Sequence, residues 1–205
     1  MKGKAYANRK PETERPKGDF YETPSCMVQE LLNTGLFYGP LFTGLPCKEA
    51  RIYDPCCGNY AIGNVLRKNG YKNIKENDII YGNDFLKEND EREYDIIIMN
   101  PPFKLFDEFV KKAKKKAWKV YCIGKMNFFG AHSRNINELW KGLEWVLPFD
   151  RMIAFDKPEI NGKVECGMIV SCFMIWDCEY DKYPKIKVID VQKYIRPSTK
   201  RDYKE

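Results

Sequence analysis

The segment Asp95–Phe103, DIIIMNPPF, ends an apolar run with groups that could act on a planar amine. An exocyclic aromatic amine is a poor nucleophile, because its lone pair is delocalised into the ring. Two acceptors aimed at its N–H bonds, the Asn100 side-chain oxygen and the Pro101 carbonyl, would draw the nitrogen towards a tetrahedral, nucleophilic geometry. Pro101 and Pro102 fix the backbone and remove competing donors. The Phe103 ring could stack on the aromatic ring that carries the amine, such as adenine. An ordinary strand that ends in proline would explain the prolines, but not the step from a polar to an aromatic residue.

A second group of candidate side chains consists of three acids that follow short apolar stretches. Asp54 lies in DPCCG, where Gly58 lets the backbone approach a ligand closely. Asp78 lies in KENDII, and Asp84 lies in YGNDFL, where Phe85 follows it. Acceptors for ribose hydroxyls and for an exocyclic amine, with an aromatic ring beside them, would suit an adenosine cofactor. Each Asp could instead be an ordinary turn or cap residue, and both interpretations stay open at this point.

The candidate residues follow elements whose alternation predicts a mostly parallel sheet. Short apolar runs indicate strands, and segments with helical spacing indicate the connections between them. Strands are expected at 51–54, 95–99 and 119–123, and helices at 25–32, 61–69, 105–117 and 133–143. Two further strands, at 151–155 and 168–176, are expected to form a hairpin at the sheet edge. Ligands bind beyond the carboxyl ends of the strands in such sheets, which is where the candidate residues lie.

The bulk properties indicate one globular domain with basic ends. The chain has 205 residues, of which 43% are hydrophobic, and the expected fold class is α/β with a Rossmann-like, doubly wound sheet. The domain is expected at 20–181, with a flexible basic arm at 1–19 and a basic tail at 182–205. The arm carries six Lys and Arg against three acids, and the tail carries eight against three. Such ends suit a polyanion such as nucleic acid, although merely solvated lysine-rich ends would look the same.

The eight cysteines show neither a disulfide framework nor the spacing of a zinc site. Cys56 and Cys57 are adjacent, and no CxxC pair occurs in a chain that has one histidine. Free thiols in a reducing cytosol are the better interpretation, and no metal site is expected. The N-terminus lacks the apolar core of a secretory signal, and no apolar run reaches the ~20 residues of a membrane span. The expected location is therefore cytoplasmic, with no membrane partner.

Together the motifs resemble those of amino-methyltransferases that use S-adenosylmethionine, and most closely those of small, phage-type adenine-N6 DNA methyltransferases. The corner Asn100–Phe103 is similar to the NPPF or NPPY of that family, and the loop Asp54–Gly58 is similar to its DPxxG. The segment Phe20–Pro24, FYETP, is similar to its FxTP, and the match spans residues 18–125. The resemblance implies the class I methyltransferase fold. It also implies methyl transfer to the N6 amine of an adenine that is flipped out of DNA.

The resemblance further implies that S-adenosylmethionine lies against the DPCCG loop and the two acids beyond it. Asp54 and Gly58 would contact its methionine part, and Asp78 would contact the ribose. Asp84 would accept from the cofactor's adenine amine, and Phe85 would pack on the adenine ring. The remaining cofactor residues are Phe20, Thr23 and Pro24, which would close the pocket, and Cys56 in the loop. The catalytic residues would be Asn100, Pro101, Pro102 and Phe103.

Two features depart from the family pattern, and alternatives remain. Tyr60 stands where the family usually has a second glycine, and its side chain could narrow the cofactor pocket. The separate target-recognition domain of large members is lacking, so residues 126–165 are expected to read the target. The same corner would serve adenine in RNA or the side-chain amide of a protein glutamine. A catalytically degenerate nucleic-acid-binding module is a further alternative, which Tyr60 favours and the intact corner opposes. Target sequence, strand preference, oligomeric state and biological role do not follow from the sequence.

Overall fold

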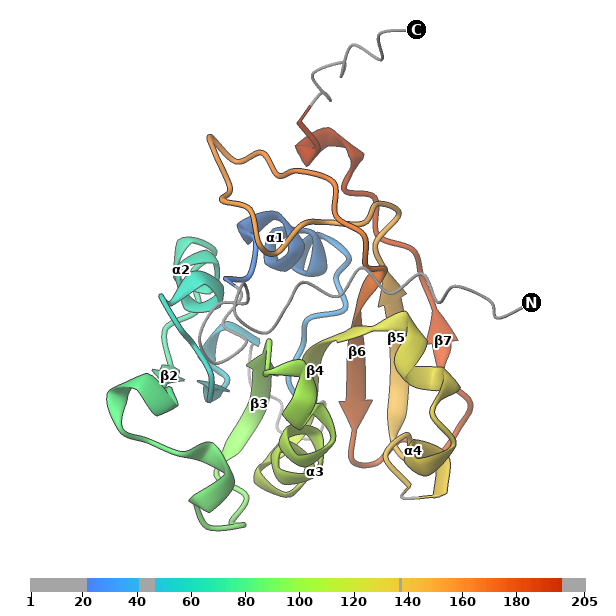
Figure 1. Cartoon of the computed structure of the whole chain (residues 1–205). Helices are drawn as coiled ribbons and strands as arrows, with labels where there is room; N and C mark the ends of the chain where they lie inside the picture. Colours follow the sequence, from blue (N-terminus) through green and yellow to red (C-terminus); the bar gives the residue numbers. More distant parts are fainter. Residues whose placement is uncertain (1–21, 41–46, 137, 197–205) are drawn as a thin grey trace, which may run out of the picture.

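A seven-stranded sheet forms the centre of the protein, in the order β2-β1-β3-β4-β6-β5-β7 (Figure 1). The structure is a computed structural model that describes residues 22–40, 47–136 and 138–196. The strands are Ile52–Asp54 (β1), Ile74–Glu76 (β2), Tyr94–Met99 (β3), Ala117–Lys125 (β4), Leu143–Pro148 (β5), Ser171–Asp177 (β6) and Lys185–Ile186 (β7). β1 to β4 are mutually parallel, and β6 is antiparallel to both of its neighbours. Because β2 and β3 lie on opposite sides of β1, the strand order reverses there, which is the usual place for a ligand.

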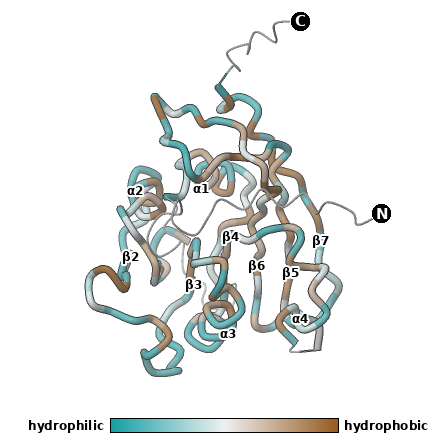
Figure 2. The backbone as a smooth tube through the Cα atoms, in the orientation of Figure 1, coloured by the Kyte–Doolittle hydropathy of each residue, from teal (hydrophilic) through white to brown (hydrophobic). Residues whose placement is uncertain are grey.

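Helices cover both faces of this sheet. The helices are Ser25–Asn33 (α1), Ala61–Lys68 (α2), Phe106–Lys116 (α3) and His132–Ile136 (α4). Ile96 and Ile98 of β3 pack in the core that contains α1 and α2, whereas Ile97 and Met99 pack in the core that contains α3. A parallel strand that is buried on both faces needs such a continuous apolar run. Figure 2 shows hydrophobic colouring along the central strands and hydrophilic colouring on much of the outer turns.

The expected parallel part of the sheet is confirmed. The strands expected at 51–54, 95–99 and 119–123 are β1, β3 and β4, and the helices expected at 25–32, 61–69 and 105–117 are α1, α2 and α3. β2 was not expected, because Ile74 is its one apolar residue and its side chains are half-buried or exposed. Among the described residues, no helix has the length and apolar character that crossing a membrane requires.

The hairpin expected from 151–155 and 168–176 is wrong in its first strand. β6 occupies most of the second segment, but its antiparallel hairpin partner is β5. The helix expected at 133–143 is wrong in its second half: α4 is His132–Ile136, and Gly142 has a left-handed φ of 80° just before β5 begins at Leu143. Residues 151–155 make one isolated bridge, from Ile153 to Cys166. They belong to an excursion, residues 149–170, which connects β5 to β6 and rises beyond one end of the sheet beside α1 (Figure 1).

Part of the segment expected to form a basic tail, residues 182–205, packs against the domain. β7 pairs with β5, and Ile189 and Val191 are fully buried. The Tyr194 hydroxyl donates to Glu30 of α1 at 2.7 Å, so this segment is also tied to the first helix. Residues 185–196 are therefore part of the folded unit, whereas the arm at 1–19 lies outside the described residues.

Candidate active site

Three motifs that lie far apart in the sequence meet at the carboxyl ends of β1 and β3. Asn100 follows β3 directly, and its Nδ2 donates to Thr23 Oγ1 at 3.1 Å across 77 residues of sequence. Cys56, in the loop after β1, lies within hydrogen-bonding reach of the Asn100 backbone, and burial raises its thiol pKa well above the usual value. Thr23 is buried, and Pro24 immediately precedes α1. The structure therefore brings Thr23 of the FxTP segment together with the DPCCG and NPPF segments, while Phe20 lies outside the described residues.

The Asn100 amide is oriented by this contact. Since Nδ2 donates to Thr23, the carbonyl oxygen Oδ1 is turned away from Thr23. Pro101 follows in buried backbone, and Pro102, at φ −52° and ψ 125°, leads into a short 3-10 turn that begins at Phe103. The amide oxygen and the first proline carbonyl thus stand on neighbouring residues of one rigid corner, as a pair of acceptors for an amine requires.

The Phe103 ring is held from three sides. The Lys125 ammonium, at the end of β4, lies 3.9 Å above the ring centroid. Phe128 and Phe155 approach edge-to-face, with ring centroids 6.1 and 6.5 Å away. Phe155 comes from the excursion, so this connection also supports the NPPF corner. A cation over an aromatic face is stabilising, and here it fixes the ring beside the acceptor pair.

The DPCCG loop carries a buried carboxylate that is only half hydrogen-bonded. Asp54 is 1% exposed, and its Oδ1 accepts from the Cys56 backbone N–H at 3.2 Å. Its Oδ2 has no hydrogen-bond partner among the described residues. Burial first, and then the charges of Glu76 and Asp78, raise the pKa of Asp54 well above its usual value, against the opposing hydrogen bond from Cys56. An orphaned buried oxygen is costly, and a cationic ligand group would satisfy it.

Two residues of this loop have left-handed backbone. Gly58 has a φ of 50°, and Tyr60 has a φ of 62°, in the region that glycine favours. The Tyr60 ring stacks on Tyr81, with centroids 5.7 Å apart and planes 10° from parallel. The Tyr81 hydroxyl donates to the Gly58 carbonyl at 2.8 Å. Tyr60 thus preserves the backbone conformation that a glycine would adopt, and its side chain is drawn onto Tyr81.

Asp78 and Asp84 both serve as cap residues of 3-10 turns. Asp78 is buried, and its two oxygens accept from the N–H groups of Gly58, at 3.0 Å, and Ile80, at 3.1 Å. Asp84 is half-buried and accepts from the N–H of Leu86 at 3.1 Å. The ordinary turn interpretation therefore holds for both, without excluding a ligand, because each carboxylate oxygen has two lone pairs. The hydrogen bond that the Gly58 N–H donates to Asp78 also links the loops that follow β1 and β2.

The expected packing of Phe85 on an adenine ring is not what the structure shows. Phe85 is 2% exposed and lies in the core beneath α3. Its ring contacts Tyr53 and Phe109, at centroid distances of 5.9 and 5.3 Å. A ring enclosed in this way offers no face to a ligand, so Phe85 supports the position of Asp84 from inside the core.

Sequence reasoning missed two features beside the DPCCG loop. Glu76 ends β2 as the Cα partner of Asp54, forms an ion pair with Arg67 of α2, and has one oxygen, Oε1, without a hydrogen-bond partner in the described structure. Ile79 and Ile80 then stand 69% and 59% exposed immediately after Asp78. The sequence signal was Asp78 followed by two isoleucines. Two adjacent isoleucines are normally predicted to be buried, and their exposure is understood only once β2 is known to be an edge strand.

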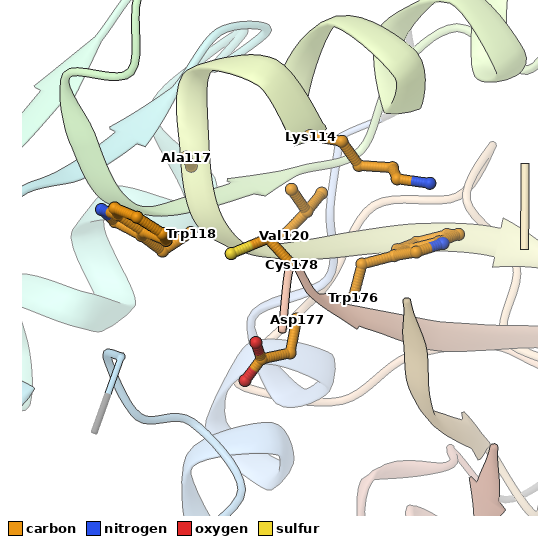
Figure 3. A pocket seen from close by; sticks show the side chains of 7 residues that line it. All are labelled: Lys114, Ala117, Trp118, Val120, Trp176, Asp177 and Cys178. Carbon is orange, nitrogen blue, oxygen red and sulfur yellow. The ribbon is translucent and has the colours of Figure 1, made fainter. Parts of the chain in front are cut away.

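The depression drawn in Figure 3 lies away from these residues. Its lining comes from the end of α3, the start of β4 and the end of β6, and consists of Lys114, Ala117, Trp118, Val120, Trp176, Asp177 and Cys178. It therefore lies at the amino ends of the parallel strands, opposite the end where Asp54 and Asn100 gather. Asp177 is also engaged by Lys119 at 2.9 Å. Across the described residues, no cluster of three or more His, Cys, Asp or Glu side chains could hold a metal ion.

The comparisons with known proteins bear on the fold. No protein-family model matches this sequence, and no curated protein does. One similar solved structure is a Pyrococcus horikoshii protein assigned to the RNA methyltransferases, with 17% identity, coverage of 80% of this chain and 90% of that chain, and a TM-score of 0.50. Another is the methyltransferase subunit of a type I restriction-modification system from Streptococcus thermophilus. The identity is 13%, the match covers 84% of this chain and 48% of that chain, and the TM-score is 0.50. The chain has the class I methyltransferase fold, as its motifs predicted.

Proposed function

We propose that the protein transfers a methyl group from S-adenosylmethionine to the exocyclic N6 amine of adenine in DNA. The observation that carries this proposal is the Asn100 amide, which Thr23 orients at the carboxyl end of β3 beside the Pro101 carbonyl. Two adjacent acceptors suit an amine with two N–H bonds. The contact also gives the FxTP segment, which favours DNA among the related enzymes, a direct physical connection to the NPPF corner.

The residues around Asp54 fit S-adenosylmethionine. This cofactor carries an ammonium and a sulfonium, and the unpaired Asp54 Oδ2 lies in a corner with two further carboxylates, Glu76 and Asp78. Left-handed backbone at Gly58 allows close approach, and the exposed Ile79 and Ile80 offer apolar surface for an adenine ring. When bound, the cofactor supplies an activated methyl group. No step requires a metal ion or a strong base.

The residues of the NPPF corner act by position and by accepting hydrogen bonds. Asn100 Oδ1 and the Pro101 carbonyl accept from the target amine and localise its lone pair, while Phe103 holds the base plane. The cofactor would supply the methyl group to this nitrogen and would keep the electron pair of the broken C–S bond on its sulfur. The amine is then positively charged, so its excess proton is lost readily to water. Thr23 acts through Asn100 and is a positioning residue.

DNA is favoured as the partner over RNA or a protein glutamine. The similarity of the fold to a restriction-modification subunit agrees with DNA, but the similarity to an RNA methyltransferase is equally close. The FxTP segment favours DNA over RNA, and the basic residues at 1–19 favour a nucleic acid over a protein. RNA adenine is the second candidate, because the same acceptor pair would receive its amine.

The variant Asn100→Ala tests the mechanism. It removes one of the two acceptors, so methyl transfer to DNA is expected to be lost, while calorimetric titration still detects S-adenosylmethionine binding. Asn33→Ala, on an exposed residue at the far end of α1, serves as the control and is expected to keep both. Retained methylation in Asn100→Ala would overturn the proposed role of the corner.

A further inference from the structure

Three consecutive apolar residues stand exposed at the end of the excursion. Met168, Ile169 and Val170 are 79%, 41% and 45% exposed, immediately before β6. The backbone of the last of these residues is fixed to the sheet, because the Met126 N–H donates to the Val170 carbonyl at 3.0 Å and extends the β4–β6 ladder. Single exposed apolar residues are ordinary on a protein surface, but a run beside a candidate site indicates a contact surface.

This apolar run is adjacent to the NPPF corner. Lys125 is the Cα partner of Ser171, the residue that follows Val170, and the same Lys125 lies over the Phe103 ring at 3.9 Å. β5 is parallel to β4 through their shared neighbour β6, so the excursion leaves the sheet at the end where β3 finishes. The run therefore flanks the place where a target base would meet Phe103.

The segment that carries the run is firmly supported. Gly167 donates its N–H to the Met152 carbonyl at 2.6 Å, and a Cβ at Gly167 would lie 2.6 Å from the Ile153 carbonyl oxygen. Further along the excursion, Glu159 accepts from the Ser25 N–H at 2.7 Å and from its hydroxyl at 2.5 Å. The apolar side chains are thus presented on a backbone that is pinned at both the sheet and α1.

We propose that Met168 and Ile169 form a wedge that enters the base stack of duplex DNA where the flipped adenine leaves a gap. The inference rests on the proposed function and names its substrate as double-stranded DNA. Extruding a base costs a few kcal/mol in lost stacking and pairing. Apolar side chains that enter a base step hold the duplex open and replace part of the lost contact. An aliphatic chain and a thioether fill the gap without reading a base, so the wedge contributes to flipping rather than to sequence preference.

The test compares a double variant with a matched control on three DNA substrates. Met168→Ser/Ile169→Ser removes the wedge, and Ile186→Ser/Val188→Ser removes two exposed apolar side chains, 68% and 60% exposed, from the region of β7. The substrates are a duplex with the target adenine paired to thymine, the same duplex with the adenine opposite an abasic site, and the single strand. The readout is kcat/KM for methyl transfer.

The wedge variant is expected to lose about tenfold or more on the paired duplex, and to stay within about twofold of wild type on the other two substrates, where flipping costs little. The control variant is expected to match wild type on all three. Equal loss on all substrates, or no loss on the paired duplex, would overturn the wedge while wild-type activity upholds the proposed function. A wild-type protein that methylates none of the three would overturn both.

Discussion

Asp54→Asn removes the negative charge of the orphaned carboxylate while keeping its shape. The hydrogen bond from the Cys56 N–H to Oδ1 is retained, and the new Nδ2 can donate towards the carboxylates of Glu76 and Asp78, which repel the native charge. Leaving a buried polar group unsatisfied costs about 1–3 kcal/mol. We therefore expect the cofactor-free variant to be more stable than wild type at pH 7.5 by about 1–3 kcal/mol, or roughly 2–12 °C in Tm for a chain of this size.

The sign of the pH dependence follows from the direction of the pKa shift. Burial raises the pKa of Asp54 in the folded state, so the folded protein holds this proton more tightly than the unfolded chain does. The resulting stability is present at low pH and is lost as the pH rises from about 4, the unfolded value, through the raised folded value. Asp54→Asn has no titrating group at this position, so its stability does not fall in this way as the pH rises. The difference in stability between variant and wild type is therefore expected to grow with pH across that window.

Thermal unfolding with and without S-adenosylmethionine, from pH 4 to 8, measures both effects. Added cofactor is expected to raise the Tm of wild type and to leave that of Asp54→Asn nearly unchanged, since the anionic partner is gone. Asp181→Asn, on an exposed residue, controls for the loss of a charge. A destabilised Asp54→Asn protein at neutral pH, or a stability difference that does not vary with pH, would refute the reasoning about the orphaned oxygen.

Three further variants probe the contacts around the site. Thr23→Val removes the hydroxyl that holds the Asn100 amide, so kcat should fall at least about tenfold with little change in cofactor affinity. Thr23→Ser keeps the hydroxyl and should retain activity. Equal kcat in the two variants would contradict the positioning role. Tyr60→Gly should keep the Tm near that of wild type, whereas Tyr60→Val should cost about 1–2 kcal/mol in unfolding experiments, because a β-branched residue tolerates a φ of 62° poorly. Lys125→Met removes the cation over Phe103, so the ring is held less firmly, and we expect a higher KM for DNA, while calorimetry finds cofactor affinity unchanged.

The central part of the fold could be predicted because its signals are local. β3 is an unbroken apolar run, and α3 repeats its buried residues at helical spacing. β2 carries little such signal, since an edge strand with one isoleucine owes its existence to pairing with β1. The expected helix at 133–143 ends where β5 begins, and no strand was expected over β5. The decisive feature, the left-handed Gly142, is a backbone property that the sequence alone permits but does not require.

The candidate site shows the same division between local and tertiary information. The residue types after β1 and β3 predicted hydrogen-bond acceptors, and the structure places Asp54 and Asn100 at the carboxyl ends of these neighbouring strands. The bond from Asn100 to Thr23 spans 77 residues, so only the resemblance to known motifs could associate the two. Burial could not be anticipated either: Phe85 follows an acid in a polar loop yet fills the core, whereas Ile79 and Ile80 look like core and stand in solvent.

The most direct test of the proposed function is transfer of an isotopically labelled methyl group from S-adenosylmethionine to three separate pools: unmethylated DNA, total RNA and protein extract. Each pool is then digested and its products are separated by mass. Label in N6-methyladenine released from DNA is the expected result, with none in the same digest after incubation with Asn100→Ala. Label confined to RNA or to glutamine would contradict DNA as the substrate, and the absence of label from all three pools would contradict methyl transfer itself.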